Sequence, residues 1–286
     1  MPRLRLKLRL VAARPPGRVP ATPEFAVVET AAFPACWGVM NLSSTSPRAS
    51  AALFDVDGTL VDSNDLHAAA WAEAFRRFGH DIPEQRIRFQ VGKGGDNLIP
   101  ALLPDLGDDE REQLEAYRSD LYKTDYLPEV KPFPGVRPLF ERLRADGVAI
   151  VLASSSGRDE VDHNLDLVGC RDLVSAATSR DDVEHSKPCP DIFEAALGKA
   201  GVPADKALVV GDTPWDVKAA ARTGLATIGF RSGGFEDRDL IEAGVKALYD
   251  GPEDLLRRYH SSPFARGEGP DSSPAKAMTC RRGGHG

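Results

Sequence analysis

Residues 51–59 read Ala-Ala-Leu-Phe-Asp-Val-Asp-Gly-Thr, a short apolar run that ends in two acidic residues and a glycine. An apolar run of this length, closed by turn residues, is typical of a buried β-strand. Because side chains alternate along a strand, Asp55 and Asp57 point to the same side, and Gly58 permits a sharp turn after them. Two carboxylates this close repel each other unless a cation or a shared proton intervenes. The stretch predicts a strand that ends in a cation-binding or reactive site, with an ordinary Asp-Gly turn as the alternative.

Strand-like and helix-like patterns alternate along the following chain. This alternation predicts an α/β fold, a Rossmann-like parallel sheet with helices on both faces, in which a site lies at the carboxyl ends of the strands. The expected strands are Ala51–Val56, Val148–Ala153, Asp172–Ala176, Ala207–Val210, Ala226–Phe230 and Lys246–Tyr249. The expected helices are Gly135–Ala145, Asp159–Leu167, Pro190–Ala200, Pro214–Thr223 and Arg238–Ala243.

The stretch 65–132 interrupts this alternation, because it contains no convincing strand. Helical patterns cover Leu66–Phe78, Asp96–Leu103 and Asp108–Tyr122, and the first of these has an apolar face. We expect an all-helical cap over residues 65–132, inserted after the first strand into a catalytic core of residues 51–64 and 133–261. In this position a cap closes over the strand ends and excludes water during chemistry.

The two ends of the chain differ from the middle in composition. Residues 1–50 are rich in Arg, Pro, Ala and Ser, and we expect them to form a disordered extension. A targeting segment is one alternative, and a natural start at Met40 is another. Residues 262–286 consist largely of Gly, Ser, Pro and charged residues, and we expect a disordered tail.

Composition excludes several classes of protein. The 286 residues carry a net charge of −7 and are 42% hydrophobic, which rules out a wholly disordered chain and a basic protein that coats nucleic acid. Basic residues gather at the ends, so the middle is acidic, which suits a cation site and disfavours a nucleic-acid partner. No apolar run approaches the roughly 20 residues of a membrane helix, so we expect no membrane partner. The four cysteines form no CxxC pair, which suits a reducing compartment such as the cytoplasm.

A second acidic motif, Gly211-Asp212-Thr213-Pro214-Trp215-Asp216, follows the strand expected at 207–210. Asp212 again falls at the carboxyl end of a strand, and Asp216 lies one helical turn further on. Oxygen ligands clustered in this way suit Mg²⁺ rather than zinc. Helix capping by Asp212 or Thr213 ahead of Pro214 is the alternative reading.

Two further loops carry groups that suit a phosphate. Ala153-Ser154-Ser155-Ser156-Gly157 follows the strand expected at 148–153, and its hydroxyl and backbone N–H groups suit a phosphoryl oxygen. In Ser186-Lys187-Pro188-Cys189-Pro190-Asp191, two prolines brace a lysine that is suited to neutralise a phosphate and a nucleophilic carboxylate. An ordinary Ser-Gly loop and a solvated surface lysine are the alternatives.

These four segments, in this order, resemble the haloacid dehalogenase-like hydrolase superfamily. The resemblance spans about residues 51–260 and covers all four of the family's motifs. The insert after the first motif resembles the family's small helical cap, which points to the branch of phosphoglycolate-phosphatase-like and β-phosphoglucomutase-like enzymes.

The resemblance implies a role for each motif residue. Asp55 is then the nucleophile that forms an aspartyl-phosphate, and Asp57 is the general acid and later the base. Ser154 hydrogen-bonds the transferring phosphoryl group, and Lys187 balances charge between that group and Asp55.

The resemblance also implies a magnesium site. Asp212 binds Mg²⁺ together with Asp55 and the backbone carbonyl of Asp57. Asp216 supports the metal from outside or binds it directly.

Substrate contacts are expected from Ser155 and from two cap residues, Lys93 and His67. Lys93 lies in the glycine-rich stretch 91–97, which corresponds to the family's substrate-reading loop, and His67 falls where mutase relatives place a histidine. The alternatives are a solvated lysine in a flexible turn and a histidine in a surface or hinge contact.

Together the motifs predict a Mg²⁺-dependent phosphatase that hydrolyses a small phosphate monoester. A phosphosugar mutase is the enzymatic alternative, and a non-catalytic binding protein that has kept the fold is the third reading. Asp57 argues against dehalogenation, because relatives that cleave carbon–halogen bonds lack this acid. The sequence specifies neither the ester nor the oligomeric state.

Overall fold

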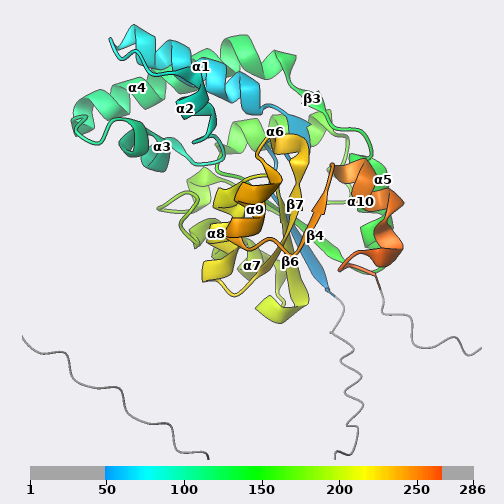
Figure 1. Ribbon diagram of the computed structural model, residues 1–286. Helices are drawn as coiled ribbons and strands as arrows, with labels where there is room; N and C mark the ends of the chain where they lie inside the picture. Colours follow the sequence, from blue (N-terminus) through cyan, green and yellow to red (C-terminus); the bar gives the residue numbers. More distant parts are fainter. Residues whose placement is uncertain (1–48, 266–286) are drawn as a thin grey trace, which may run out of the picture. The chain divides into compact units, whose positions relative to one another are not determined.

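In the computed structural model, which describes residues 49–265, six parallel strands form the central sheet in the order β5-β4-β1-β6-β7-β8 (Figure 1). The strands are β1 (Ala51–Phe54), β4 (Ala149–Ala153), β5 (Ala176–Thr178), β6 (Ala207–Gly211), β7 (Ala226–Phe230) and β8 (Ala247–Tyr249). Strand β1 pairs with β4 on one side and with β6 on the other. The strand that leads to Asp55 therefore lies inside the sheet, between the strands that lead to Ser154 and Asp212.

Helices cover both faces of this sheet. They are α5 (Val136–Ala145), α6 (Arg158–Leu167), α7 (Asp191–Ala200), α8 (Pro214–Arg222), α9 (Asp237–Ala243) and α10 (Pro252–Arg257). Ala52 and Phe54 of β1 belong to the apolar cluster closed by α5, α6 and α10, whereas Ala51 and Leu53 belong to the cluster closed by α7 and α8. Burial on both faces explains why these strands are continuous apolar runs. The predicted α/β fold is confirmed.

Three elements differ from the predicted boundaries. The strand expected at Asp172–Ala176 begins only at Ala176, which pairs with Val151. Leu173 and Val174 instead form a turn, in which both N–H groups donate to the Cys170 carbonyl oxygen. The prediction was misled by this apolar pair, which packs against the core although it lies in a turn rather than in a strand. Strand β1 ends at Phe54, two residues early, and helix α10 was not predicted.

The insert between the first two sheet strands is mainly helical. Its helices are α1 (Asn64–Arg77), α2 (Glu84–Arg88), α3 (Gly95–Leu102) and α4 (Asp108–Leu121), followed by a π-helical turn η1 (Tyr122–Tyr126) and a 3-10 turn η2 (Leu127–Glu129). Trp71, Phe75, Ile87 and Leu98 help to form an apolar cluster of the insert's own. Figure 1 shows α1 to α4 gathered on one side of the sheet.

Two short strands join the insert to the core. Strand β2 (Val61–Asp62) pairs in antiparallel fashion with β3 (Lys131–Pro132), so the chain enters and leaves the insert at one place. The expectation of an insert without strands therefore missed β3. A strand of two residues is too short to show a period of two in the sequence. Helix α2, with five residues, was missed for a similar reason.

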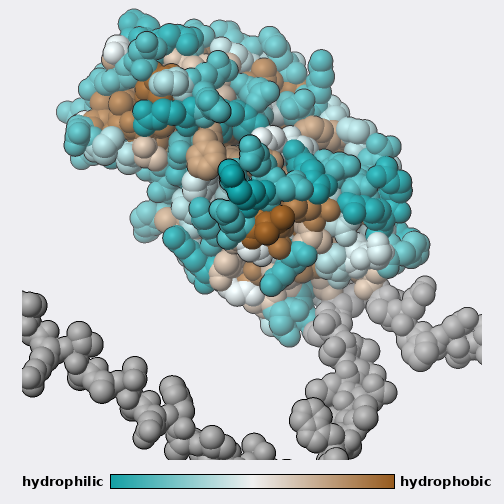
Figure 2. All heavy atoms as spheres, viewed as in Figure 1, coloured by the Kyte–Doolittle hydropathy of each residue, from teal (hydrophilic) through white to brown (hydrophobic). Residues whose placement is uncertain are grey.

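The ends predicted to be disordered, residues 1–50 and 262–286, lie mostly outside the described residues. The tail boundary at 262 is wrong, because Phe264 is fully buried in the core cluster beside Tyr259. Other short turns are η3 (Arg180–Asp182), η4 (Ala204–Lys206), η5 (Arg231–Gly233) and η6 (Tyr259–Ser261). Within residues 49–265, no helix combines the length and the apolar character that crossing a membrane requires. Polar residues cover most of the face seen in Figure 2.

Candidate functional site

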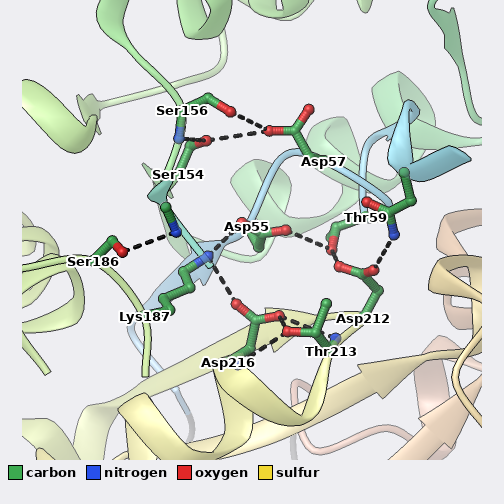
Figure 3. A network of polar contacts seen from close by, with 12 residues as sticks. Asp55, Asp57, Thr59, Ser154, Ser156, Ser186, Lys187, Asp212, Thr213 and Asp216 are labelled. Carbon is green, nitrogen blue, oxygen red and sulfur yellow. Dashed lines mark hydrogen bonds and ion pairs between the residues drawn. The ribbon is translucent and has the colours of Figure 1, made fainter. Parts of the chain in front are cut away.

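The four motif loops meet at the carboxyl ends of the central strands (Figure 3). Asp55 and Asp57 follow β1, Ser154 follows β4, and Asp212 follows β6. Lys187 comes from the loop before α7, and its side chain reaches the same place. Parallel strands bring their carboxyl ends to one edge of a sheet, so residues far apart in the sequence converge there.

Three buried carboxylates form the centre of the site. Asp55, Asp212 and Asp216 each offer an oxygen, and these atoms all lie within 4.8 Å of one another. Lys187 Nζ lies 2.5 Å from Asp55 Oδ1 and 2.8 Å from Asp216 Oδ1, and the lysine is 1% exposed. One ammonium group thus faces three carboxylates, and the cluster retains an excess of negative charge. A divalent cation with a preference for oxygen ligands fits this donor set.

The pKa values of these groups reflect the same imbalance. Burial raises the pKa of Asp55 well above its usual value; Lys187 opposes the shift, and the neighbouring carboxylates add to it. Burial, together with the charge of Asp216, raises the pKa of Asp212 to about 7. Burial alone would lower the pKa of Lys187, but attraction to Asp216 and Asp55 raises it above its usual value. A cation bound here would replace protons as the counter-charge.

Neighbouring side chains hold the two distal acids in place. Asn64 Nδ2 donates to Asp212 Oδ2 at 2.7 Å, and Thr59 Oγ1 donates to Asp212 Oδ1 at 2.9 Å. Asp216 Oδ2 accepts from the backbone N–H and hydroxyl of Thr213, which is the N-cap of α8. The capping expected for Thr213 is therefore present, and Asp216 both completes the cap and pairs with Lys187.

Gly58 allows the first motif to approach the fourth. Its φ of +75° belongs to the left-handed region, which favours glycine. A Cβ at this position would overlap with Asn64 Nδ2 and Asp212 Oδ2. The glycine is required both by the turn and by the close passage of the Asp212 carboxylate.

Asp57 lies apart from the three-carboxylate cluster, in a shell of donors. Ser63 Oγ and His67 Nε2 donate to Asp57 Oδ1 at 2.7 and 3.0 Å, and Ser156 Oγ donates to Asp57 Oδ2 at 2.7 Å. Ser154 Oγ is 3.5 Å from the same oxygen. Burial alone would raise the pKa of Asp57, but electrostatic attraction to His67 and hydrogen bonds from His67, Ser156 and Ser63 outweigh it and lower the pKa.

His67 contacts Asp57 through one ring nitrogen and Arg118 of the cap through the other. Arg118 of α4 donates to His67 Nδ1, and a guanidinium has no acceptor, so Nδ1 accepts and Nε2 carries the proton given to Asp57. Tyr122 stacks on the ring with 4.0 Å between centroids. Since both nitrogens are taken, the arrangement favours support of Asp57 over the expected substrate contact.

A cavity of about 630 Å³ opens above Asp55 and Asp57, between core and cap. Ser155 lines it with a buried hydroxyl that has no hydrogen-bond partner, which fits a binding role. Lys93 also lines it, but its ammonium donates to Gln90 Oε1 and lies 3.9 Å from the centroid of the Trp215 ring. The charged part of Lys93 is therefore held by protein groups. Trp215, at the start of α8, therefore contacts the cap through Lys93.

Glu160 of α6 lines the same cavity and is 3% exposed. Its Oε2 is buried without a hydrogen-bond partner, and no ion pair to it occurs among residues 49–265. Sequence reasoning missed Glu160, since a lone glutamate on a helix gives no signal.

Sequence reasoning also missed several residues that hold the motif acids. Thr59 and Ser156 are adjacent to motif residues and were visible within the quoted motifs. Ser63, Asn64 and Arg118 had no recognisable signal, because they depend on how the cap meets the core.

The comparisons with known proteins agree with this architecture. The model of the haloacid dehalogenase-like hydrolase family matches residues 52–230. A phosphoglycolate phosphatase of Yersinia pseudotuberculosis is 33% identical over 185 residues, covering 63% of this chain and 80% of its own. A phosphorylated carbohydrates phosphatase of Thermotoga maritima is 27% identical over 210 residues, covering 72% and 96%.

A solved structure of a hydrolase from Pseudomonas syringae is 32% identical, with a TM-score of 0.71, and the match covers 75% of this chain and 99% of that one. The family match covers more than half of the chain, and it includes all four motif loops described above. The chain belongs to the haloacid dehalogenase-like hydrolases.

Proposed function

We propose that the protein is a Mg²⁺-dependent phosphatase that hydrolyses a small, soluble phosphate monoester through an aspartyl-phosphate on Asp55. One observation carries this proposal: a buried carboxylate, Asp55, lines a cavity and stands beside two further carboxylates and one lysine. A phosphate dianion enters such a site only if countercharge is present. The phosphatase relatives from Yersinia and Thermotoga support the same chemistry.

Asp55 is the nucleophile in this proposal. Its carboxylate attacks phosphorus, the bond to the ester oxygen breaks, and the phosphoryl group passes to Asp55. Lys187, which contacts Asp55 Oδ1, stabilises the charge on the transferring group. Ser154 and Ser155, on the neighbouring loop, bind its remaining oxygens.

Asp57 acts as general acid in the first half-reaction and as general base in the second. In the first it gives a proton to the leaving oxygen, and in the second it takes one from the attacking water. The donors around it hold it as a carboxylate, which is the form the second half-reaction needs. Asp57 must therefore gain a proton before the first half-reaction, while the Nε2–H of His67, 3.0 Å away, keeps it oriented as a hydrogen-bond donor.

Asp55, Asp212 and Asp216 fit Mg²⁺, as does the backbone carbonyl of Asp57 expected from the family resemblance. The bound cation would supply positive charge against the phosphate and the carboxylates. Thr59 and Asn64 orient Asp212 for this role.

The test is phosphate release from a panel of small phosphate esters, with and without Mg²⁺. We expect release that requires Mg²⁺ and is abolished in Asp55→Asn. The matched control is Asp62→Asn, which changes an exposed carboxylate on β2 and leaves release unchanged. Release that persists in Asp55→Asn would refute the nucleophile. Conversion of a sugar phosphate into its isomer without free phosphate would establish the mutase instead.

A further inference from the structure

Ser186, the residue before Lys187, is bound almost entirely by the cap. Asp96 Oδ2 accepts from the Ser186 backbone N–H at 2.9 Å, and Asp96 Oδ1 accepts from its hydroxyl at 2.5 Å. Gly94 N donates to Ser186 Oγ at 2.8 Å, and Asn97 Nδ2 donates to the Ser186 carbonyl oxygen at 2.8 Å. The other contact of that carbonyl is local, from Cys189 N at 3.0 Å. Each polar group of Ser186 thus has a partner within residues 94–97, the N-cap and first turn of the cap helix α3.

The two glycines at the start of α3 permit this close approach. A Cβ at Gly94 would lie 2.6 Å from Ser186 Oγ and 2.7 Å from Asp96 Oδ1, and a Cβ at Gly95 would lie 2.5 Å from Glu115 Cδ. Arg180 of the core adds a second connection, since its guanidinium lies 2.9 Å from Glu115 Oε1 and 3.6 Å from Asp96 Oδ1. Gly94, Gly95 and the ion pairs of Arg180 therefore allow Asp96 to lie against the loop that carries Lys187.

The residues that lead into α3 face the cavity. Gly92, Lys93, Gly94 and Gly95 line it above Asp55. The segment that meets a substrate is therefore continuous with the segment that holds Ser186, and Lys187 Nζ in turn contacts Asp55 and Asp216. Figure 3 shows Ser186 and Lys187 side by side, with the lysine directed to the two acids.

We propose that Asp96 is a positioning residue for Lys187. Through Ser186, it fixes the lysine loop only when the cap is seated, so that cap closure completes the charge arrangement around Asp55. This inference rests on the proposed function, because it assigns Lys187 a part in phosphoryl transfer. Small displacements of a positioned group cost large factors in rate, so a loosened lysine loop slows the chemical step more than it weakens substrate binding.

The test combines hydrogen exchange and kinetics on the full chain. The variants are Asp96→Ala, Ser186→Ala, the double variant, and Asp109→Ala as a control that removes another acid of the cap. In hydrogen exchange without substrate, Asp96→Ala should raise the exchange rate of the Ser186 amide about tenfold or more, and Asp109→Ala should leave it unchanged. Unchanged exchange in Asp96→Ala overturns the contact whatever the activity of the protein.

In kinetics with p-nitrophenyl phosphate and Mg²⁺, Asp96→Ala should lower kcat about tenfold or more and change KM by less than about threefold. The double variant should be no slower than the slower single variant, within about twofold, because both changes break one connection. Multiplying effects, or a change confined to KM, would overturn the positioning role. Thermal melting of each variant separates these effects from unfolding.

The two proposals fail in different ways. Wild-type protein that releases no phosphate, or Asp55→Asn that retains activity, defeats the phosphatase and leaves the exchange experiment to decide the Asp96 contact. Rapid exchange together with unchanged kcat in Asp96→Ala defeats the positioning of Lys187 and leaves the phosphatase intact.

Discussion

At the scale of single residues, the site is a balance of buried charges. Lys187 is the ammonium that contacts Asp55 and Asp216, and all three are almost fully buried. Removing one partner from a buried ion pair leaves the other uncompensated, which costs more than the pair itself contributes. The lysine therefore stabilises the fold as well as the proposed transition state.

Lys187→Met should lower the free energy of unfolding by about 3–5 kcal/mol in the absence of metal. Lys246→Met, which removes an exposed lysine, should stay within about 0.5 kcal/mol of wild type. Denaturant unfolding in EDTA measures both. Equal stability of the two variants would show that the carboxylates are neutralised by other means.

The raised pKa values predict how stability and metal binding vary with pH. Asp212 has a folded pKa of about 7, above its unfolded value, and Asp55 is shifted in the same direction. Such groups stabilise the fold below the unfolded pKa, and this contribution is lost as pH rises through the folded pKa. The lowered pKa of Asp57 acts with the opposite sign, but only in acid.

In EDTA, the melting temperature should therefore receive a falling contribution from Asp212 between pH 5 and pH 8, and Asp55 should act in the same direction. Mg²⁺ competes with their protons, so the stabilisation by Mg²⁺ should increase as the pH rises towards 7, by about 1.4 kcal/mol per pH unit for each proton displaced. Melting curves with Mg²⁺ and with EDTA at each pH give this difference. A stabilisation by Mg²⁺ that is the same at pH 5.5 and pH 7.5 would argue against a protonated acid at the site.

Glu160 is the opposite case, a carboxylate at the cavity whose Oε2 is buried without a hydrogen-bond partner. Glu160→Gln keeps the shape and removes the charge, so it should raise the free energy of unfolding by about 1–3 kcal/mol. Glu129→Gln, an exposed glutamate, serves as the control. A less stable Glu160→Gln would mean that a solvent molecule or ion already satisfies the carboxylate.

At the scale of elements, the strands and loops that the sequence predicted correctly are those with a clear local pattern. The strands β1, β4, β6 and β7 were predicted because buried parallel strands are apolar runs. Three of the four motif loops were predicted because each follows such a run, and the lysine loop was predicted because two prolines brace Lys187 ahead of a helix. The displaced β5 and the paired strands β2 and β3 were not, since their positions depend on pairing partners rather than on local pattern.

Gly58→Ala should destabilise the loop after β1 for two reasons. The residue has a positive φ, and its Cβ would overlap with Asp212. Gly201→Ala is the matched control, because Gly201 has a φ of +67° and a Cβ there meets nothing within 4 Å. The control should lose about 1 kcal/mol from backbone strain alone. Gly58→Ala should lose more and should also bind Mg²⁺ more weakly; identical losses would show that the Asp212 carboxylate moves aside freely.

At the scale of the whole molecule, the cap decides what the motifs alone do not. The motif positions of Asp55, Lys187, Asp212 and Asp216 were predictable, and the structure brings these residues together. The partners from the cap were not predictable, because Arg118 and Asp96 acquire meaning only where cap and core meet. For the same reason, Lys93 was expected to point to a substrate, whereas its ammonium lies on Trp215.

All site residues lie between positions 55 and 216, so deletion of residues 1–39 should leave kcat within about threefold of the full chain. Parallel assays of the two proteins on one phosphate ester check this. A loss of much more than threefold would mean that the first residues take part in folding or in the site.

The central claim is the covalent role of Asp55, and the most direct measurement is an acid quench at a series of times within one turnover. The protein is mixed with Mg²⁺ and a phosphate ester that it hydrolyses, and the peptide that contains Asp55 is then examined by mass spectrometry. We predict a phosphoryl group on Asp55 that appears and decays at rates compatible with turnover, and none in Asp55→Asn. Turnover with the phosphoryl group on another residue, or with unmodified protein at every time, would contradict the account.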